Sequence, residues 1–98
     1  MEKERFEYLA SQIFQAALEV HKMLGPGLLE SVYEFALVKE LQLRNIEVRY
    51  QVKVPLIYKE HDTGKEFFID ILVEDEIVIE VKSVEHVLPV HQAHYYRI

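Results

Sequence analysis

Residues 67–82, FFIDILVEDEIVIEVK, decide the fold, because two apolar runs flank a short acidic segment. Residues 67–73 and 77–81 are rich in Phe, Ile, Leu and Val, and Glu74-Asp75-Glu76 separates them. Runs of this kind, bounded by polar turn residues, are typical of β-strands. Their nearly continuous apolar character is expected in the middle of a sheet that is covered on both faces. The stretch therefore predicts a hairpin at the centre of a sheet.

Three charged residues interrupt this hairpin: Asp70, Glu80 and Lys82. Side chains two positions apart in a strand share a face, so Glu80 and Lys82 point the same way. A three-residue loop pairs Val73 with Ile77 and therefore sets Asp70 opposite Glu80, whereas a two-residue loop turns Asp70 to the other face. Whether the trio is grouped depends on the length of the turn.

An opposed pair of carboxylates can bind a divalent metal ion. Opposed Cβ atoms lie about 4.5–5.5 Å apart, where two bare carboxylates repel but can chelate one hard cation through oxygen. Bound Mg²⁺ or Mn²⁺ stabilises charge that develops on phosphorus, and a nearby lysine can orient or help deprotonate the attacking water. Asp70, Glu80 and Lys82 are therefore candidate catalytic residues, with Asp70 and Glu80 as metal ligands. The alternative is a cross-strand salt bridge from Lys82 to either carboxylate, with no further role.

The N-terminal two thirds of the chain predict two helices and one strand. Apolar residues recur at steps of three and four over residues 4–24 and again over residues 29–44, the spacing of amphipathic helices. Residues 25–27, GPG, separate them, since proline cannot continue a helix and glycine readily takes positive φ. Residues 48–58 alternate like a half-buried strand, and residues 61–65, HDTGK, supply turn chemistry.

Beyond the hairpin, Pro89 suits the first turn of a closing helix that contains His91, Gln92 and Tyr95 and runs to the last residue. The expected element order is thus α-α-β-β-β-α, without internal repeat, linker or low-complexity segment. We expect one α/β domain over residues 1–98, with a small sheet flanked by helices.

Composition limits the classes of partner and compartment. The chain has 98 residues and no cysteine, which excludes disulfides and thiolate metal sites. No apolar run approaches the roughly 20 residues that span a bilayer, and the charged N-terminus lacks a signal core, so a cytoplasmic protein is expected. The net charge of −6 argues against a broad grip on phosphates. Metal binding would cancel part of this negative charge. The remaining excess suggests that any binding of nucleic acid is local, weak, or shared with another chain, such as a homo-oligomer partner.

Several motifs follow one another in order: Gly27-x-x-Glu30-x-x-Tyr33, then Asp70, Glu80-x-Lys82 and Pro89-Val90-His91-Gln92-Ala93. In these motifs the chain resembles the GxxExxY protein family, a branch of the PD-(D/E)XK nuclease superfamily, over nearly its whole length. The resemblance implies a restriction-endonuclease-like core, in which a mixed sheet lies between helices. It also implies a nuclease that cleaves DNA, or RNA, with Mg²⁺ or Mn²⁺.

The resemblance assigns roles to single residues. Asp70 and Glu80 would bind the metal, Lys82 would be the catalytic lysine, and Glu30 would match the additional carboxylate that many members bring to the metal. Glu30 could instead be a helix N-terminal carboxylate that the helix dipole favours. Tyr33 could pack in the core rather than contact substrate.

The C-terminal part departs from the family pattern. Relatives usually carry a glutamine three residues after the histidine and a tyrosine four residues further on, followed by a longer helix and another strand. His94 and Ile98 occupy those positions here, and the longer helix and further strand are missing, so we expect either a truncated form or a fold that something else completes. His91 and His94 lie one helical turn apart, but a zinc site lacks a third ligand at suitable spacing. His91 and Gln92 are interpreted as contacts to phosphate or to the metal-binding side chains.

Two classes of function follow from these observations. The first is a metal-dependent nuclease. The second is a catalytically inert nuclease-like module that binds a protein partner, or a dimer that binds nucleic acid, as the negative charge and the shortened C-terminus suggest. The best local basic set for a backbone phosphate is Lys39, Arg44, Arg49 and Lys53, although solvated surface charge is the commoner explanation.

Overall fold

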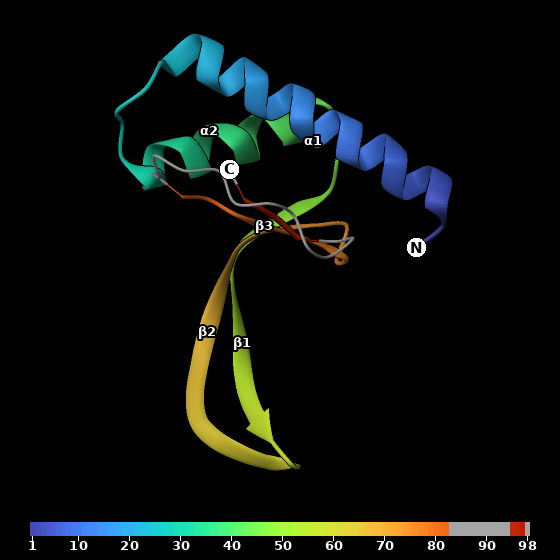
Figure 1. Cartoon of the computed structure of the whole chain (residues 1–98), viewed down its shortest axis with the longest axis vertical. Helices are drawn as coiled ribbons and strands as arrows, with labels where there is room; N and C mark the ends of the chain where they lie inside the picture. Colours follow the sequence, from blue (N-terminus) through green and yellow to red (C-terminus); the bar gives the residue numbers. More distant parts are fainter. Residues whose placement is uncertain (83–94, 98) are drawn as a thin grey trace.

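The computed structural model describes residues 1–82 and 95–97 as two helices and a four-stranded sheet (Figure 1). The elements are α1 (Lys3–Leu24), α2 (Glu30–Leu43), β1 (Val48–Tyr58), β2 (His61–Val73), β3 (Ile77–Glu80) and β4 (Tyr95–Arg97). The strand order is β1-β2-β3-β4, with β1, β2 and β3 antiparallel and β4 parallel to β3. The sheet is therefore mixed, and the expected order of two helices followed by three strands is confirmed. Neither helix in this part of the chain is long and apolar enough to cross a membrane.

Both helices form where the apolar periodicity predicts them. In α1 the buried positions Leu9, Ile13, Ala16 and Val20 follow one another at steps of four, three and four, which keeps them on one stripe of the helix. The helix ends at Gly25, where φ is +74° and the backbone N–H donates to the carbonyl of His21 at 2.9 Å. Glycine adopts this conformation without the steric cost that a side chain adds.

The core lies between the helices and one face of the β2–β3 hairpin. Ile71, Val73, Ile77 and Ile79 on this face are all fully buried against α1 and α2. Leu72 and Val78 point to the opposite face. The two helices described pack on a single face, so the expectation of a sheet covered on both faces by helices is not met among residues 1–82 and 95–97.

The β1–β2 turn lies elsewhere than the sequence predicts. The chain reverses at Lys59-Glu60, both with positive φ, rather than within residues 61–65. The turn-forming residues lie instead in a bulge of β2. This bulge lies opposite the point in β1 where the register shifts, between Pro55 and Ile57. There the Asp62 carboxylate accepts the backbone N–H of Gly64 at 2.8 Å. Asp and Gly thus stabilise a local bulge, which has the same side-chain chemistry as a turn.

The prediction of a closing helix is wrong at the C-terminal end of that helix. Tyr95–Arg97 form β4, which pairs with the open edge of β3. Tyrosine favours strands, and an unpaired strand edge supplies backbone partners that a terminal helix lacks. The beginning of the expected helix, with Pro89, His91 and Gln92, lies outside the described residues.

Candidate functional site

The turn between β2 and β3 has the length on which the candidate site depends. Residues 74–76 form a three-residue turn, and Val73 pairs with Ile77, followed by Ile71 with Ile79. The observed pairing ends there, and the same register continued by one position would set Asp70 opposite Glu80. Arg5 of α1 holds the turn through hydrogen bonds to both carboxylate oxygens of Glu74, which raise the pKa of Arg5. The predicted odd-length turn is therefore confirmed.

Asp70 is held by donors from both neighbouring strands. Its Oδ2 accepts the backbone N–H of Val81 at 2.9 Å, just past the end of β3. Its Oδ1 accepts from Nε2 of Gln51 on β1 at 3.4 Å. The side chain is half-buried, and these contacts fix the direction of its carboxylate.

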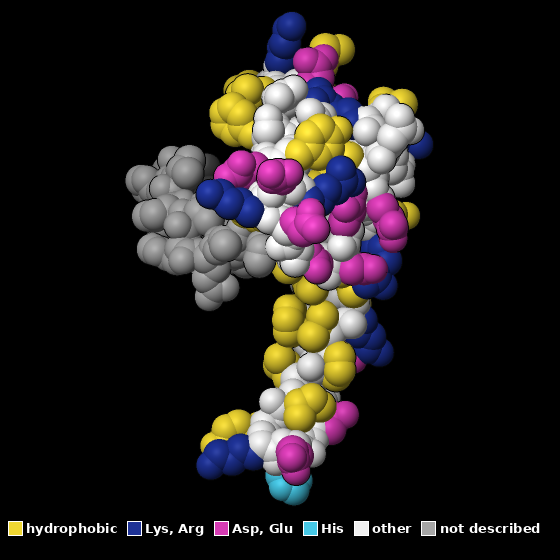
Figure 2. All heavy atoms as spheres, turned by 90° about the vertical axis from the view of Figure 1, so that its right-hand side faces the viewer, with side chains coloured by type: hydrophobic (Ala, Val, Ile, Leu, Met, Phe, Trp, Pro, Cys, Tyr) yellow, Lys and Arg dark blue, Asp and Glu magenta, His cyan; other side chains and the backbone are white. Residues whose placement is uncertain are grey.

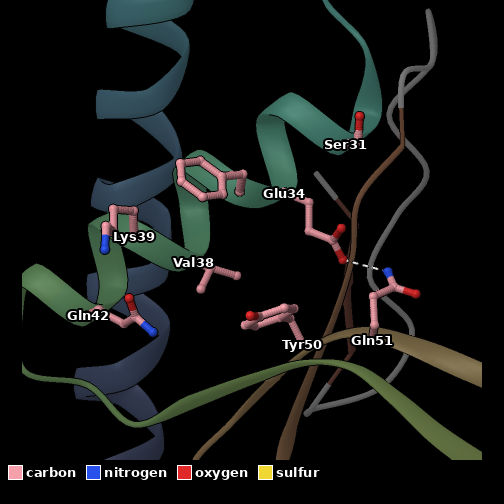
Figure 3. Close-up of a pocket in the computed structure, with 8 residues that line it drawn as sticks. Ser31, Glu34, Val38, Lys39, Gln42, Tyr50 and Gln51 are labelled. Carbon is pink, nitrogen blue, oxygen red and sulfur yellow. Dashed lines mark hydrogen bonds between the residues drawn. The ribbon is translucent and has the colours of Figure 1, made fainter.

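Gln51 and Glu34 belong to this site, although sequence reasoning missed them. Gln51 Nε2 also donates to Oε1 of Glu34 on α2 at 2.7 Å, which the dashed line in Figure 3 marks. Gln51 has a φ of +49° within β1, a conformation that is uncommon for a residue with a side chain. The sequence did not indicate its place, because the register that sets it between the Tyr50–Ile71 and Val52–Ile69 pairs, opposite Asp70, follows from the turn at Lys59-Glu60 with its neighbouring register shift and not from the predicted turn. Glu34 lies one helical turn after Glu30, but nothing in the sequence indicated that it would reach β1.

Glu80 and Lys82 lie side by side as their spacing predicts. The distance from Lys82 Nζ to Glu80 Oε1 is 3.7 Å, and the two side chains are 41% and 29% exposed. A solvent-accessible ion pair of this kind stabilises a fold by little. Both groups are thus accessible to a ligand.

Glu30 begins α2 and is exposed. Its place in the first helical turn suits a carboxylate that the helix dipole favours. Among residues 1–82 and 95–97, no group of three or more His, Asp or Glu side chains is arranged to hold a metal ion. The described residues therefore do not form a three-ligand metal group around Asp70 and Glu80, and the role of Glu30 stays a prediction.

Tyr33 has a structural place in the Gly-x-x-Glu-x-x-Tyr motif. Its ring is buried against His21, with ring centroids 5.4 Å apart. Its hydroxyl donates to the carbonyl of Gly25 and accepts the backbone N–H of Leu28 at 3.4 Å. Tyr33 in α2 thus stabilises the turn between the helices through the hydrogen bonds of its hydroxyl. Its buried ring agrees with the core-packing interpretation.

A cavity of about 480 Å³ opens beside the Glu34–Gln51 contact (Figure 3). Its walls come from α2 and the start of β1, and the lining residues are Ser31, Glu34, Phe35, Val38, Lys39, Gln42, Tyr50 and Gln51. Gln51 is shared by this cavity and by the Asp70 carboxylate. The cavity therefore adjoins the candidate site.

The predicted basic set is largely neutralised by ion pairs. Arg44 pairs with Glu40 at 2.9 Å, Arg49 with Asp75 at 2.8 Å and Lys53 with Glu66 at 3.1 Å. Lys39 lines the cavity. Surface charge is thus the better interpretation for three of the four residues.

Comparison with protein families gives a match over most of the chain. The family model of the PD-(D/E)XK nuclease superfamily matches residues 7–97. No curated protein and no solved structure matches the chain. The match includes α2, all four strands and each candidate residue named above.

Proposed function

Because the chain belongs to the PD-(D/E)XK nuclease superfamily, we propose that it is a metal-dependent nuclease of the GxxExxY branch that hydrolyses phosphodiester bonds of DNA or RNA. The observation that carries the proposal is the register of β2 and β3, whose last pair, Ile71 with Ile79, directly precedes Asp70 and Glu80. Lys82 lies within ion-pair distance of Glu80 on the same face. This arrangement combines two carboxylates with one ammonium group, a set that metal-assisted hydrolysis of a phosphodiester can use.

The donor set suits a hard divalent cation. Asp70 and Glu80 offer carboxylate oxygens from adjacent strands, and oxygen is the ligand that Mg²⁺ and Mn²⁺ prefer. Glu30 is the proposed third carboxylate, in keeping with the family pattern. When bound, the ion would neutralise the phosphate oxygens and lower the pKa of a coordinated water.

The remaining residues orient this pair. The backbone N–H of Val81 and the amide of Gln51 hold the Asp70 carboxylate in one direction. Gln51 is itself held by Glu34, so α2 contributes to the orientation of a β2 side chain. Such preorganised ligands lose little freedom when they bind. His91 and Gln92 stay proposed contacts to phosphate or to the metal-binding side chains.

Lys82 is the proposed catalytic lysine. Its ammonium is half-exposed beside Glu80 and can orient the attacking water or stabilise negative charge on the phosphate. The test is cleavage of single- and double-stranded DNA and RNA in Mn²⁺ or Mg²⁺. We expect metal-dependent cleavage by the wild type and its loss in Lys82→Ala.

Lys22→Ala is the matched control, because Lys22 is an exposed lysine in the last turn of α1. Its cleavage should equal that of the wild type. Failure of every substrate to be cleaved in either metal, or equal cleavage by Lys82→Ala and wild type, would contradict the proposed function.

The second candidate function is a nuclease-like module that binds nucleic acid or protein without cleaving. The net charge of −6 and the ion pairs that occupy Arg44, Arg49 and Lys53 favour binding of a protein, because few cations are left for phosphate. A module that binds protein predicts neither cleavage nor oligonucleotide binding, whereas one that binds nucleic acid predicts salt-dependent oligonucleotide binding that persists in Lys82→Ala without cleavage.

A further inference from the structure

A long β-ribbon leaves the body of the protein. We call residues 52–69, the outer part of β1 and β2, the arm. In Figure 1 the arm extends well away from the two helices. The radius of gyration is 14.3 Å, against about 13 Å for a compact domain of 100 residues. Two-stranded ribbons are marginally stable in water when nothing packs on them.

The arm has two chemically different faces. The register pairs Val52 with Ile69 and Val54 with Phe67, so these four side chains form one apolar face. It continues the face of Ile71, which is fully buried beneath the helices. The core surface therefore runs out along the arm beyond the part that the helices cover.

The opposite face is more polar, since it carries Lys53 and Glu66 beside Phe68, Pro55 and Ile57. Lys53 pairs with Glu66 across the strands at 3.1 Å, and Lys53 lies opposite Phe68. Figure 2 shows hydrophobic side chains gathered along one side of the arm and charged side chains along its other border. An apolar strip of this extent on one face is typical of an interaction surface.

We propose that the apolar face of the arm packs against the same face of a second copy of this chain, forming a two-fold dimer. This proposal does not depend on the nuclease activity. The charge distribution favours a second copy, since the chain carries −6 overall whereas three lysines and three acidic residues balance within residues 52–69. Two arms can therefore meet without the electrostatic repulsion that the negatively charged remainder of each chain would cause.

The available area also suits a dimer. Exposed side chains on the apolar face include Tyr50, Leu56, Tyr58 and Phe67, each between 41% and 64% exposed. Taken with the partly exposed Val52, Val54 and Ile69, they offer on the order of 500 Å² of apolar surface. A standard interface buries about 800 Å² per partner, a little over half of it apolar.

The contact should form through the face and not through the strand edge. β1 is the outer strand of the sheet, but Pro55 lacks a backbone donor and Gln51 has positive φ, so the edge cannot extend regularly. A two-fold axis across the arm would bring Phe67 and Val54 of both copies together. These residues are then the centre of the interface.

The neighbouring phenylalanines provide a matched test. Phe67 is 46% exposed on the apolar face and Phe68 is 53% exposed on the polar face. By sedimentation equilibrium we expect a wild-type dimer, a dissociation constant raised roughly tenfold or more by Phe67→Glu, and little change for Phe68→Glu. Circular dichroism melting checks that both variants fold.

Cross-linking gives a second readout, because the chain has no cysteine. Val54→Cys should form a disulfide-linked dimer under mild oxidation, and Lys53→Cys on the polar face should not. A monomeric wild type, equal weakening by the two glutamate variants, or equal cross-linking of the two cysteine variants would overturn the proposal. A monomer whose oligonucleotide binding is lost in Phe67→Glu would overturn it in favour of nucleic acid as the occupant.

Discussion

Asp70 combines a structural and a functional role, and two substitutions separate them. Its carboxylate accepts the backbone N–H of Val81, a residue that is only 4% exposed, and it is a proposed metal ligand. Asp70→Ala removes both roles. Asp70→Asn keeps an acceptor oxygen for the N–H but weakens metal binding, because it removes the negative charge.

The expected magnitudes without metal follow from the hydrogen bonds. A buried donor that loses its acceptor costs about 1–3 kcal/mol, so Asp70→Ala should lower the free energy of unfolding by roughly 2 kcal/mol. For a chain of this size, each 1 kcal/mol shifts the melting temperature by about 4–8 °C. Asp70→Asn keeps the bond to Val81 and should cost about 1 kcal/mol or less, since the contact with Gln51 is long, at 3.4 Å.

Metal then distinguishes the wild type from both variants. An ion present at 100 times its dissociation constant stabilises the native state by about 2.7 kcal/mol. The assay is thermal melting at constant ionic strength with and without Mn²⁺. We expect the Mn²⁺-induced rise only in the wild type. An Asp70→Asn protein that melts as early as Asp70→Ala without metal would refute the hydrogen-bond reasoning, and a full Mn²⁺ response in Asp70→Asn would refute the metal site.

Two further predictions concern the turn between the helices. Tyr33→Phe removes the hydroxyl that bonds Gly25 and Leu28, so it should cost about 1 kcal/mol; denaturant unfolding should show this loss, with Tyr8→Phe on exposed α1 surface unchanged as the control. Gly27→Ala should cost about 1 kcal/mol through backbone strain alone, since φ is +85° and no atom lies within 4 Å of the added Cβ. An unchanged melting temperature for Gly27→Ala would contradict this.

The register of the central hairpin could be predicted because local rules determine it. Side chains alternate along a strand, and a slip of one residue would turn Ile71, Val73, Ile77 and Ile79 away from the helices. Only a turn with an odd number of residues satisfies this burial. The positions of Asp70 and Glu80 follow from the same constraint, although neither residue contributes to the core.

Other parts depend on contacts that no local pattern encodes. Lys59 and Glu60 form the β1–β2 turn with positive φ, while the stronger turn formers Asp62 and Gly64 stabilise a bulge nearby. Turn propensity tells which residue types favour a tight bend of the backbone. It does not tell whether they form the turn itself or a bulge two positions away from it. The strand at Tyr95–Arg97 depends likewise on the free edge of β3, which exists only after the sheet has formed.

The turn motif and the acidic pair are connected through α2. Tyr33 fastens the turn at Gly25, which fixes where α2 begins, and the next residue in the helix is Glu34. Glu34 holds Gln51, and Gln51 contacts Asp70. A rigid helix transmits the placement of its first turn to a side chain one residue further on, so the geometry of the turn limits where the Asp70 carboxylate can point. The motif residues 27–33 and the hairpin residues 70–82, although far apart in sequence, are therefore parts of one structural unit, which explains how a turn with no charged group of its own can bear on the candidate site.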